Sequence, residues 1–539
     1  MLAILFLSAA VFFILAYRFY GRFMSEKFGL DNSKKTPAET MYDGMDYVPS
    51  HPALVLGHHF SSIAGAGPIV GSITAAGMFG WLPAYIWVLL GSSFVGGPHD
   101  TGSLVASIRH KAQSTGMVIK RWIGEKGSFL FLCFSILTLL LVQAVFLQLT
   151  CINMAADPAV AFTAIVYMFM ALVVGLLIYR FNVPLKWVTV LMLPVVFGTL
   201  WLGSSSETIM TMFALPLETW RWIIIAYMVA ASLLPVWLLL QPRDYMTSYF
   251  LYFVLLVGAV GMIFGSGQFE VTAPAFKGFS TETAYLWPIL FVVVACGAVS
   301  GFHSMVGSGT TSKQIRKEKD TLIVGYGGML LEGIVAVIAL GTFMIATQTD
   351  VSPMIAYANG FSKFASLLGI DPAMGATLGL FAINSFLLTS LDTATRLTRY
   401  QIQEISGNRV NKYAATAIAV AGALVLVLSK AGDQSIADVI WPIFGSANQL
   451  VAALALLTIA VWLKKGLKVD NRWLIYPMWF MLTTTVTALF LLLYNQLMVV
   501  KVTNWVLVVI SIALLGLAFL MVREAMVALK DESAKPAST

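Results

Sequence analysis

Apolar runs of about 20 residues follow one another along almost the whole chain, and a helix needs this length to cross a bilayer. Hydrophobic residues make up 59% of the 539 residues and charged residues 11%, whereas soluble domains carry about 25% charged residues. The sequence therefore predicts an all-α polytopic membrane protein with about fifteen spans and no separate soluble domain. These spans are expected near residues 1–20, 52–72, 73–97, 127–155, 157–179, 183–203, 219–240, 246–267, 285–310, 322–348, 373–395, 412–430, 437–462, 473–496 and 503–522.

Positive charge is spread over short loops, although the formal net charge is +7. Because the basic residues do not cluster, a nucleic-acid partner is not expected. If the N-terminus lies outside, the alternating spans put most basic residues inside, as the positive-inside rule requires. These include Arg22, Lys27, Arg109, Lys111, Arg180, Lys186, Arg243, Lys313, Arg316, Arg399, Lys464, Lys465 and Arg523. The prediction is a multi-pass protein of a bacterial or archaeal cell (inner) membrane, with its C-terminus in the cytoplasm.

The predicted span 52–72 contains a polar interruption, GHHFSSIAGAGP, where lipid would favour leucine. Backbone freed from helical bonding at bilayer depth survives only when it is buried in protein or lines a wet cavity, and such broken spans mark transporter sites. The alternative is that the glycines and Pro68 only permit close helix packing. The expected substrate contacts are His58, His59, Ser61, Ser62, Gly65 and Gly67, with the unwound carbonyl of Ala64 as an ion ligand.

The two adjacent histidines, His58 and His59, need separate treatment. Neighbouring helical residues point about 100° apart, so a joint metal site is not expected. Either imidazole could bind a substrate carboxylate or relay a proton near neutral pH. A structural hydrogen bond to a nearby carbonyl is an equal alternative.

Hydroxyl residues recur at three- and four-residue intervals around the end of the span 285–310. They predict one polar stripe along a helix face, which would suit Na⁺ coordination opposite the broken span. His303 lies beside the stripe as a possible proton or substrate contact. The alternative is that each hydroxyl bonds to a carbonyl of the preceding turn. The stripe consists of Ser300, Ser304, Ser308 and Thr311.

Acidic residues inside spans are the remaining polar candidates. Glu332 lies deep in its span, where a carboxylate is costly unless paired or protonated, so we expect an ion-coupling role; pairing with Lys313 or Arg396 is the structural alternative. Asp392 and Arg396 are spaced i,i+4, which predicts a local ion pair and an inner gate. His99 and Asp100 are expected in a solvated turn that begins an inside loop.

Four segments resemble the carbon starvation protein A family: GHHFSSIAGAGPIVG (57–71), SGFHSMVGSGTTSKQI (300–315), TSLDTATRLTRYQIQE (389–404) and WPIFGSANQL (441–450). Members are prokaryotic inner-membrane transporters associated with peptide or pyruvate uptake. They are grouped with the amino acid–polyamine–organocation superfamily. The resemblance implies a LeuT-like core of five plus five helices in inverted repeat, with the hydroxyl-rich span lining a sodium site.

This resemblance implies four parts of the chain. Residues 1–51 hold an extra N-terminal span and a cytoplasmic loop, and 52–203 form the first repeat. Residues 204–398 form the second repeat, and 399–539 hold four peripheral spans and a cytoplasmic tail. Pro235 is the expected break in the first helix of the second repeat, answering the break in the first.

Together these features predict a secondary active transporter rather than an enzyme. It is expected to import a small carboxylate-bearing solute, a short peptide or pyruvate, by alternating access coupled to H⁺ or Na⁺. Its expected partners are that solute and membrane lipid. ATP is not expected, because the sequence has no GxxxxGK[ST] motif. No cofactor or metal is expected either. The alternative is a membrane-embedded haem or metal redox protein that uses His58, His59, His99 and His303 as ligands.

Overall fold

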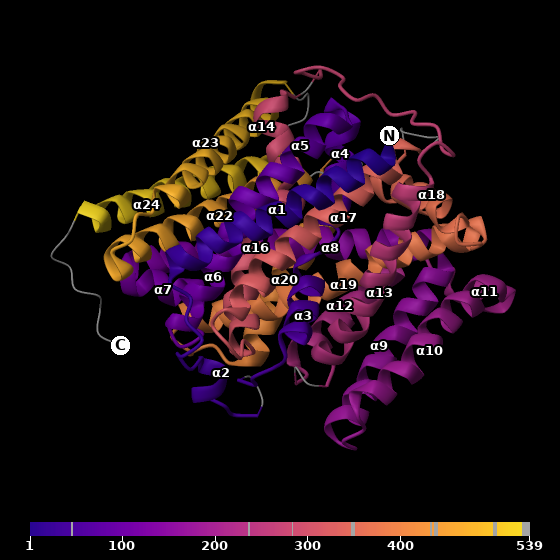
Figure 1. The fold of residues 1–539 in the computed structure, drawn as a ribbon, viewed down its shortest axis with the longest axis horizontal. Helices are drawn as coiled ribbons and strands as arrows, with labels where there is room; N and C mark the ends of the chain where they lie inside the picture. Colours follow the sequence, from indigo (N-terminus) through magenta and orange to yellow (C-terminus); the bar gives the residue numbers. More distant parts are fainter. Residues whose placement is uncertain are drawn as a thin grey trace.

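The computed structural model of the protein is a bundle of helices packed side by side (Figure 1). It describes residues 1–44, 47–235, 238–282, 284–346, 351–431, 434–435, 440–499 and 504–530. The end of the predicted cytoplasmic tail, 531–539, lies outside the described residues, as do the ends of some predicted spans.

Ten helices are long and apolar enough to cross a membrane within the described ranges. Three of them include a π-helical turn, named here with the helix that it adjoins. They are α1 (Leu2–Phe28), α8 (Glu125–Ala156), α9 (Pro158–Tyr179), α10 (Leu185–Ser205), α13 (Leu240–Phe264), η3 with α17 (Leu322–Gly327, Gly328–Met344), α19 (Pro372–Ile405), α22 with η4 (Trp441–Trp462, Leu463–Leu467), α23 with η5 (Arg472–Tyr494, Asn495–Val499) and α24 (Trp505–Lys530).

The other elements are shorter. Two bent pairs of helices also qualify as single spans: α3 (Pro52–Ile63) with α4 (Gly67–Phe79), and α11 (Glu207–Phe213) with α12 (Leu217–Leu233). The rest are α2 (Pro37–Thr40), α5 (Trp81–Gly91), η1 (Ser92–Gly96), α6 (Gly97–Arg109), α7 (Thr115–Trp122), α14 (Leu286–Val293), α15 (Ala295–Ala298), α16 (Gly301–Gly309), η2 (Thr311–Lys313), α18 (Pro353–Ser366), α20 (Lys412–Leu428) and the antiparallel strands β1 (Lys430–Ala431) and β2 (Gln434–Ser435).

The all-helical membrane fold predicted from the sequence is confirmed, with ten to twelve spans by length and composition over the described residues. The predicted number, about fifteen, also counted three segments that this criterion does not pass. The expected span 73–97 covers the second half of α4, then α5 and η1, and ends where α6 begins. The expected span 285–310 is divided into α14, α15 and α16, and 412–430 is the short helix α20.

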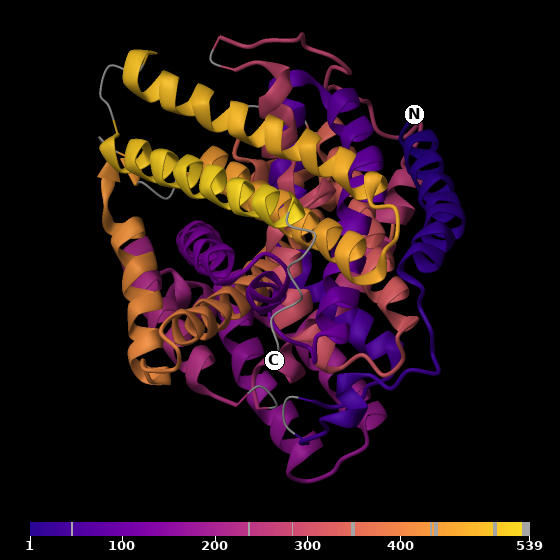
Figure 2. The same cartoon turned by 90° about the vertical axis from the view of Figure 1, so that its left-hand side faces the viewer.

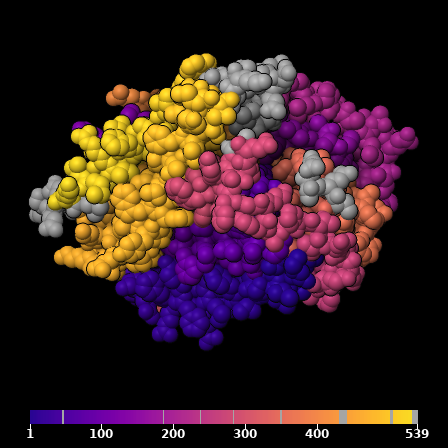
Figure 3. Space-filling model, turned by 90° about the horizontal axis from the view of Figure 1, so that it is seen from above, coloured from indigo at the N-terminus to yellow at the C-terminus, as the bar shows by residue number. Residues whose placement is uncertain are grey.

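The peripheral helices flank a central group. Helices α23 and α24 lie side by side along one flank (Figure 2), packed on α22, while α9, α10 and α11 form the opposite edge (Figure 1). From above, the chain between α13 and α14 lies across the exposed face (Figure 3). The central group contains α3, α4, α6, α16 and α17, which contact one another.

The expected break in the first core span is present. Helix α3 ends at Ile63 and α4 begins at Gly67, with a bend of 46° between them. In a continuous helix the amide of residue 68 would donate to the carbonyl of Ala64, but Pro68 has no N–H. Ala64 leaves the helical region with φ −72 and ψ 63, so this carbonyl is free of helical bonding.

A second span is interrupted between α14 and α16, not at Pro235. Val299 and Ser300 are extended, with ψ 132 and 127, and a Cβ on Gly301 would lie 2.3 Å from the carbonyl oxygen of Asn448. Pro235 instead follows the end of α12. No helix continues through Pro235, because α12 has already ended at Leu233 and α13 begins at Leu240. Whether this segment begins the second repeat stays a prediction.

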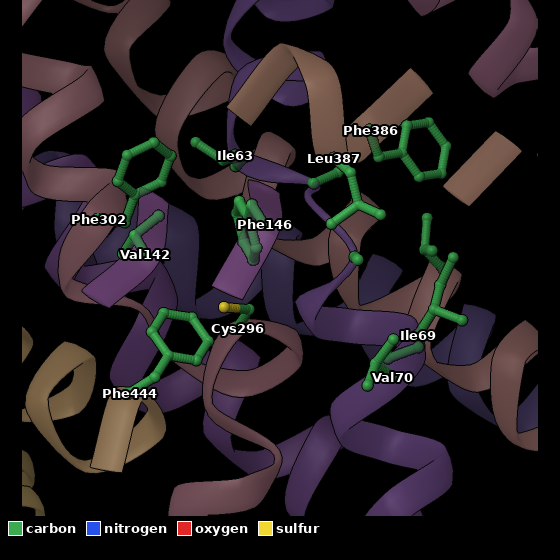
Figure 4. Close-up of a cluster of buried hydrophobic side chains, with 14 of the residues drawn as sticks. Ile63, Ile69, Val70, Val142, Phe146, Cys296, Phe302, Phe386, Leu387 and Phe444 are labelled. Atoms are coloured by element: carbon green, nitrogen blue, oxygen red, sulfur yellow. The ribbon is translucent and has the colours of Figure 1, made fainter. Parts of the chain in front are cut away.

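The two interrupted spans pack directly on each other. A Cβ on Gly71 would lie 2.4 Å from the carbonyl oxygen of Val293, and one on Gly67 would lie 2.4 Å from the Cys296 side chain. Small residues permit this close approach in membranes. Ile63, Cys296 and other apolar side chains gather around the two breaks (Figure 4). This dry packing holds the freed backbone within the protein, as bilayer depth requires.

Candidate functional site

A cluster of ionisable side chains lies where the two interrupted spans meet α6 and α17. It contains His59 from α3, His99 and Asp100 from α6, His303 from α16, and Glu332 from α17. All five are almost completely buried. Charged groups at such depth persist only when they are paired or protonated, so their mutual distances decide their roles.

His303 stands between two carboxylates. Its Nδ1 lies 2.8 Å from Asp100 Oδ2, and its Nε2 lies 3.3 Å from Glu332 Oε2. On the far side, Asp100 Oδ1 lies 2.7 Å from His99 Nδ1. Glu332 therefore has an imidazole as its neighbour, rather than Lys313 or Arg396 as the structural alternative had it. Asp100 shares hydrogen bonds with His303 and His99, whereas the contact of His303 with Glu332 is an ion-pair distance without a hydrogen bond among the described residues.

Two π-helical turns precede the two carboxylates. Segment η1 leads into α6 and Asp100, and η3 leads into α17 and Glu332. The second turn, η3, packs directly on the start of α6, since a Cβ on Gly97 would lie 2.2 Å from Tyr326. Single π-helical turns inside α-helices are frequent at functional sites. Here they mark the two helices that carry the buried acids.

Asp100 is the site residue that the sequence interpretation missed. His99 and Asp100 were expected in a solvated turn because the predicted span ended at residue 97, whereas α6 continues to Arg109 and buries both side chains. The available signal was the closeness of His99 and Asp100 to the end of an apolar run. Only the contact with His303, 203 positions away, reveals the carboxylate as part of the cluster.

The adjacent histidines face different partners, as helical geometry required. His59 Nδ1 lies 2.9 Å from Thr311 Oγ1, on the side of the buried cluster. His58 Nδ1 lies 3.0 Å from Asp244 Oδ2, on the side of α13. Helix α3 therefore separates two polar networks, one on each face.

The second network joins α13, α19 and α12. Arg243 pairs with Asp392, and the Tyr227 hydroxyl donates a 2.6 Å hydrogen bond to the same carboxylate. Asp244, beside Arg243, is the partner of His58. The arginine and both acids are at most 1% exposed. This network connects the first half of the interrupted span to the long helix α19.

The predicted local ion pair between Asp392 and Arg396 is wrong. Arg396 Nη2 instead donates to the carbonyl oxygens of Ala231 and Leu234, at 2.6 and 2.7 Å. These carbonyls belong to the end of α12, where the last turn has no helical donors. Asp392 has the closer cation Arg243 on α13. The gating role of Asp392 and Arg396 stays a prediction.

The predicted hydroxyl stripe does not form one helix face. Ser300 lies outside α16, where it accepts a 2.9 Å hydrogen bond from Asn448 Nδ2. Ser304 and Ser308 donate to the carbonyls of Gly301 and Ser304, both at 2.7 Å. These bonds follow the alternative of hydroxyls bonding to the preceding turn. Thr311 lies in η2 beside His59. The four hydroxyl residues are therefore not on one helix, because Ser300 precedes α16 and Thr311 follows it. Whether any of the four binds an ion stays a prediction.

The small residues around the first break are closely packed. A Cβ on Gly65 would lie 2.9 Å from Ser390 Oγ. Ser61 Oγ donates to the carbonyl of His58 at 3.1 Å, whereas Ser62 Oγ has no hydrogen-bond partner in the described part of the chain. Tight packing of Gly65 and Gly67 matches the packing alternative. Contact of these residues and of Ala64 with solute or ion stays a prediction.

The metal-site alternative finds no support in the positions of the four histidines. His58 and His59 point to different partners, and His99 and His303 share Asp100. Within the described ranges, no three or more His, Cys, Asp and Glu side chains are grouped so as to hold a metal ion. The imidazoles therefore serve two separate hydrogen-bonding networks.

Comparison with known proteins yields one family. Residues 1–354 and 342–488 match the family described as carbon starvation protein CstA. The peptide transporter CstA of Campylobacter jejuni is 31% identical over 562 residues, which cover 89% of this chain and 78% of that protein. The pyruvate/proton symporter BtsT of Escherichia coli is 28% identical over 595 residues, which cover 90% of this chain and 80% of that protein.

Solved structures provide a likeness of fold alone. The manganese transporter of Eremococcus coleocola, in complex with an aromatic bis-isothiourea compound, matches with a TM-score of 0.50 at 13% identity. The match covers 92% of this chain and 99% of that one. The family match spans nearly the whole helical bundle, and the relatives are named as transporters. The chain belongs to the carbon starvation protein CstA family, a family of multi-pass membrane transporters and not of enzymes.

Proposed function

We propose that this protein imports a small carboxylate-bearing solute, a short peptide or pyruvate, by alternating access coupled to protons. The observation that carries the proposal is the buried chain of Asp100, His303 and Glu332 between the two interrupted spans. The relatives' names, a peptide transporter and a pyruvate/proton symporter, support the class of solute.

Proton coupling has more support than sodium coupling. An imidazole between two carboxylates has one cation for two anions, so one further proton would neutralise the group. The free-energy cost of burying a cluster of charges is lowest when its net charge is zero. Alternating access would then let the bound proton leave on one side of the membrane. Ser304 and Ser308 donate to helix carbonyls, but a hydroxyl that donates its hydrogen keeps its oxygen lone pairs for a cation. These two oxygens and the carbonyl of Ala64 keep sodium as the second candidate.

The repeat boundaries predicted from the sequence, 52–203 and 204–398, stay a prediction, and the packing supports a different proposal. We propose that each repeat begins with one interrupted span, the first at Pro52 and the second at Leu286. The first repeat would then be α3 with α4, α5 with α6, α8, α12 and α13. In this first repeat, α9 and α10 would be inserted between α8 and α12. The second repeat would be α14 to α16, α17, α19, α20 and α22.

Equivalent helix contacts support this division. The first and fifth elements pack together in both halves, as α3 on α13 and α16 on α22. The third and fourth do the same, as α8 on α12 and α19 on α20. Each interrupted span also packs on the second element of the other half, α4 on α17 and α16 on α6. Paired contacts of this kind are expected when two halves are related by a two-fold axis in the membrane plane.

Uptake into proteoliposomes tests the proposal. Radiolabelled pyruvate and a dipeptide are offered under a pH gradient or a sodium gradient imposed separately. We expect the pH gradient to drive accumulation of at least one of them. Glu332→Gln is expected to abolish this accumulation while exchange of solute without a gradient persists, because the amide cannot carry the proton.

The control is Glu404→Gln, since Glu404 is a spanning-helix acid bound to Ser114 and remote from the cluster. It is expected to accumulate solute as the unaltered protein does. Accumulation driven by sodium alone would refute proton coupling. Unchanged proton-driven accumulation in Glu332→Gln would remove Glu332 from the mechanism.

A further inference from the structure

A cavity of about 410 Å³ lies beside α3, on the face opposite the buried cluster. Its walls come from the start of α3, the end of α9, the first half of α13 and the loop that contains Gln314. Pockets for small organic ligands usually measure about 300–1,000 Å³. The cavity is therefore large enough for a solute of dipeptide size.

His58 is the one ionisable side chain among the cavity's lining residues apart from tyrosines. Its Nδ1 lies 3.0 Å from Asp244 Oδ2, and both of its ring nitrogens are buried without a hydrogen-bond partner among the described residues. Asp244 itself is fully buried behind it. An anion entering the cavity would thus meet the imidazole before it met the carboxylate.

A buried network of Arg243, Asp244 and Asp392 lies behind His58 and carries one net negative charge. When both ring nitrogens carry a proton, Nδ1 faces Asp244 and Nε2 can donate to a solute carboxylate.

Two helix beginnings add to the positive potential at the cavity. Ala53 and Leu54 belong to the first turn of α3, and Gln241 and Pro242 to the first turn of α13, and all four residues line the cavity. The first turn of a helix carries the positive end of its dipole, which attracts a carboxylate. The amides of Ala53 and Leu54 are bonded to His51, so the attraction at α3 comes from the dipole and not from free N–H groups.

Three tyrosines of α13, Tyr245, Tyr249 and Tyr252, also line the cavity. The rings of Tyr245 and Tyr249 lie edge to face at 5.0 Å, with their hydroxyls 2.9 Å apart. Tyrosine rings offer an apolar surface with a polar rim. They suit the side chain of an amphiphilic solute better than a small, fully hydrated anion.

We infer that this cavity is a second solute site, at the predicted cytoplasmic end of the transport path, where His58 holds the carboxylate of an amphiphilic solute and the three tyrosines hold its apolar part. The inference rests on the proposed transport of carboxylates and adds a site distinct from the buried cluster. Because His58 and His59 are consecutive on α3, solute that draws His58 from Asp244 would shift the same half-helix that reaches Thr311 and the cluster.

Cysteine protection in proteoliposomes tests the site. Ala53→Cys puts an exposed thiol in the cavity wall, in a Cys133→Ser background because Cys151 and Cys296 are buried. A membrane-impermeant maleimide is applied with L-alanyl-L-phenylalanine or with its C-terminal amide, which lacks the carboxylate. We expect the dipeptide to slow labelling several-fold and the amide to leave it unchanged.

Two controls accompany this measurement. Glu39 is exposed on the short helix α2, which precedes α3 and is predicted on the same side. Labelling of Glu39→Cys is expected to be unaffected by the dipeptide. His58→Gln, added to Ala53→Cys, is expected to remove the protection. Protection that the amide gives equally, or that survives His58→Gln, would overturn the assignment of His58.

Uptake of the same dipeptide separates the two proposals. Uptake without protection would overturn the second site and leave the proposed function intact. Protection without any uptake would leave the site intact and refute the proposed transport of this solute.

Discussion

The corrected ion pair of Asp392 makes a quantitative prediction, because two cations compete for the role of partner. Arg396 is one turn away on the same helix, whereas Arg243 lies on α13. Double-mutant cycles of Asp392→Asn with Arg243→Met, and of Asp392→Asn with Arg396→Met, measure each coupling. The structure predicts strong coupling only to Arg243.

The expected magnitudes follow from burial. Arg243 is 1% and Asp392 0% exposed, and removing one partner of a buried ion pair costs about 3–5 kcal/mol in unfolding free energy. Residues in direct contact couple by about 0.5–3 kcal/mol, and the upper part of that range is expected for Asp392 with Arg243. A local i,i+4 pair would contribute only about 0.2–0.5 kcal/mol. Arg396 already has the carbonyls of Ala231 and Leu234, so its coupling to Asp392 is expected at or below that level.

Unfolding in mixed detergent micelles, followed by fluorescence of the 14 tryptophans, provides the free energies. A coupling of about 1.4 kcal/mol corresponds to a tenfold change in the unfolding constant, which such titrations resolve. Equal coupling of Asp392 to both arginines, or stronger coupling to Arg396, would refute the network drawn from the structure. A loss below about 0.5 kcal/mol in Asp392→Asn would do the same, since that is the level of an ordinary surface substitution.

Two further predictions concern packing and pH. Gly71→Val is expected to lower the thermal stability sharply, because its Cβ would lie 2.4 Å from the Val293 carbonyl oxygen. Gly77→Ala in the same helix meets nothing closer than 4.0 Å and should be tolerated. Equal melting temperatures of the two variants would contradict the packing. Burial lowers the pKa of His110, whose Nε2 accepts from Trp122. The unfolded chain therefore takes up the proton first, so stability should fall as the pH drops below about 6.5, and His110→Asn should flatten that decline in unfolding midpoints.

Local sequence features determined much of the fold. Apolar length predicted the spanning helices, and the absent amide of Pro68, with its neighbouring glycines, predicted the break between α3 and α4. Helical geometry also predicted that His58 and His59 have different partners. Each of these results depends on residues within a few turns of one another, where bonding rules act directly.

The second break, between α15 and α16, could not be predicted in the same way. It depends on the carbonyl oxygen of Asn448, which leaves no room for a side chain at Gly301. Pro235 follows the end of a helix, α12, and does not lie inside one.

The sequence by itself determined that this chain crosses a membrane many times, that its first core span is broken, and that Glu332 is buried, because hydropathy and proline chemistry are local. Only the tertiary structure decided that Asp100 and Glu332 flank His303, and that Asp392 pairs with Arg243 instead of Arg396. Charge pairing at bilayer depth depends on which helices meet. A nearer cation in the sequence has no advantage when a distant one lies closer in space.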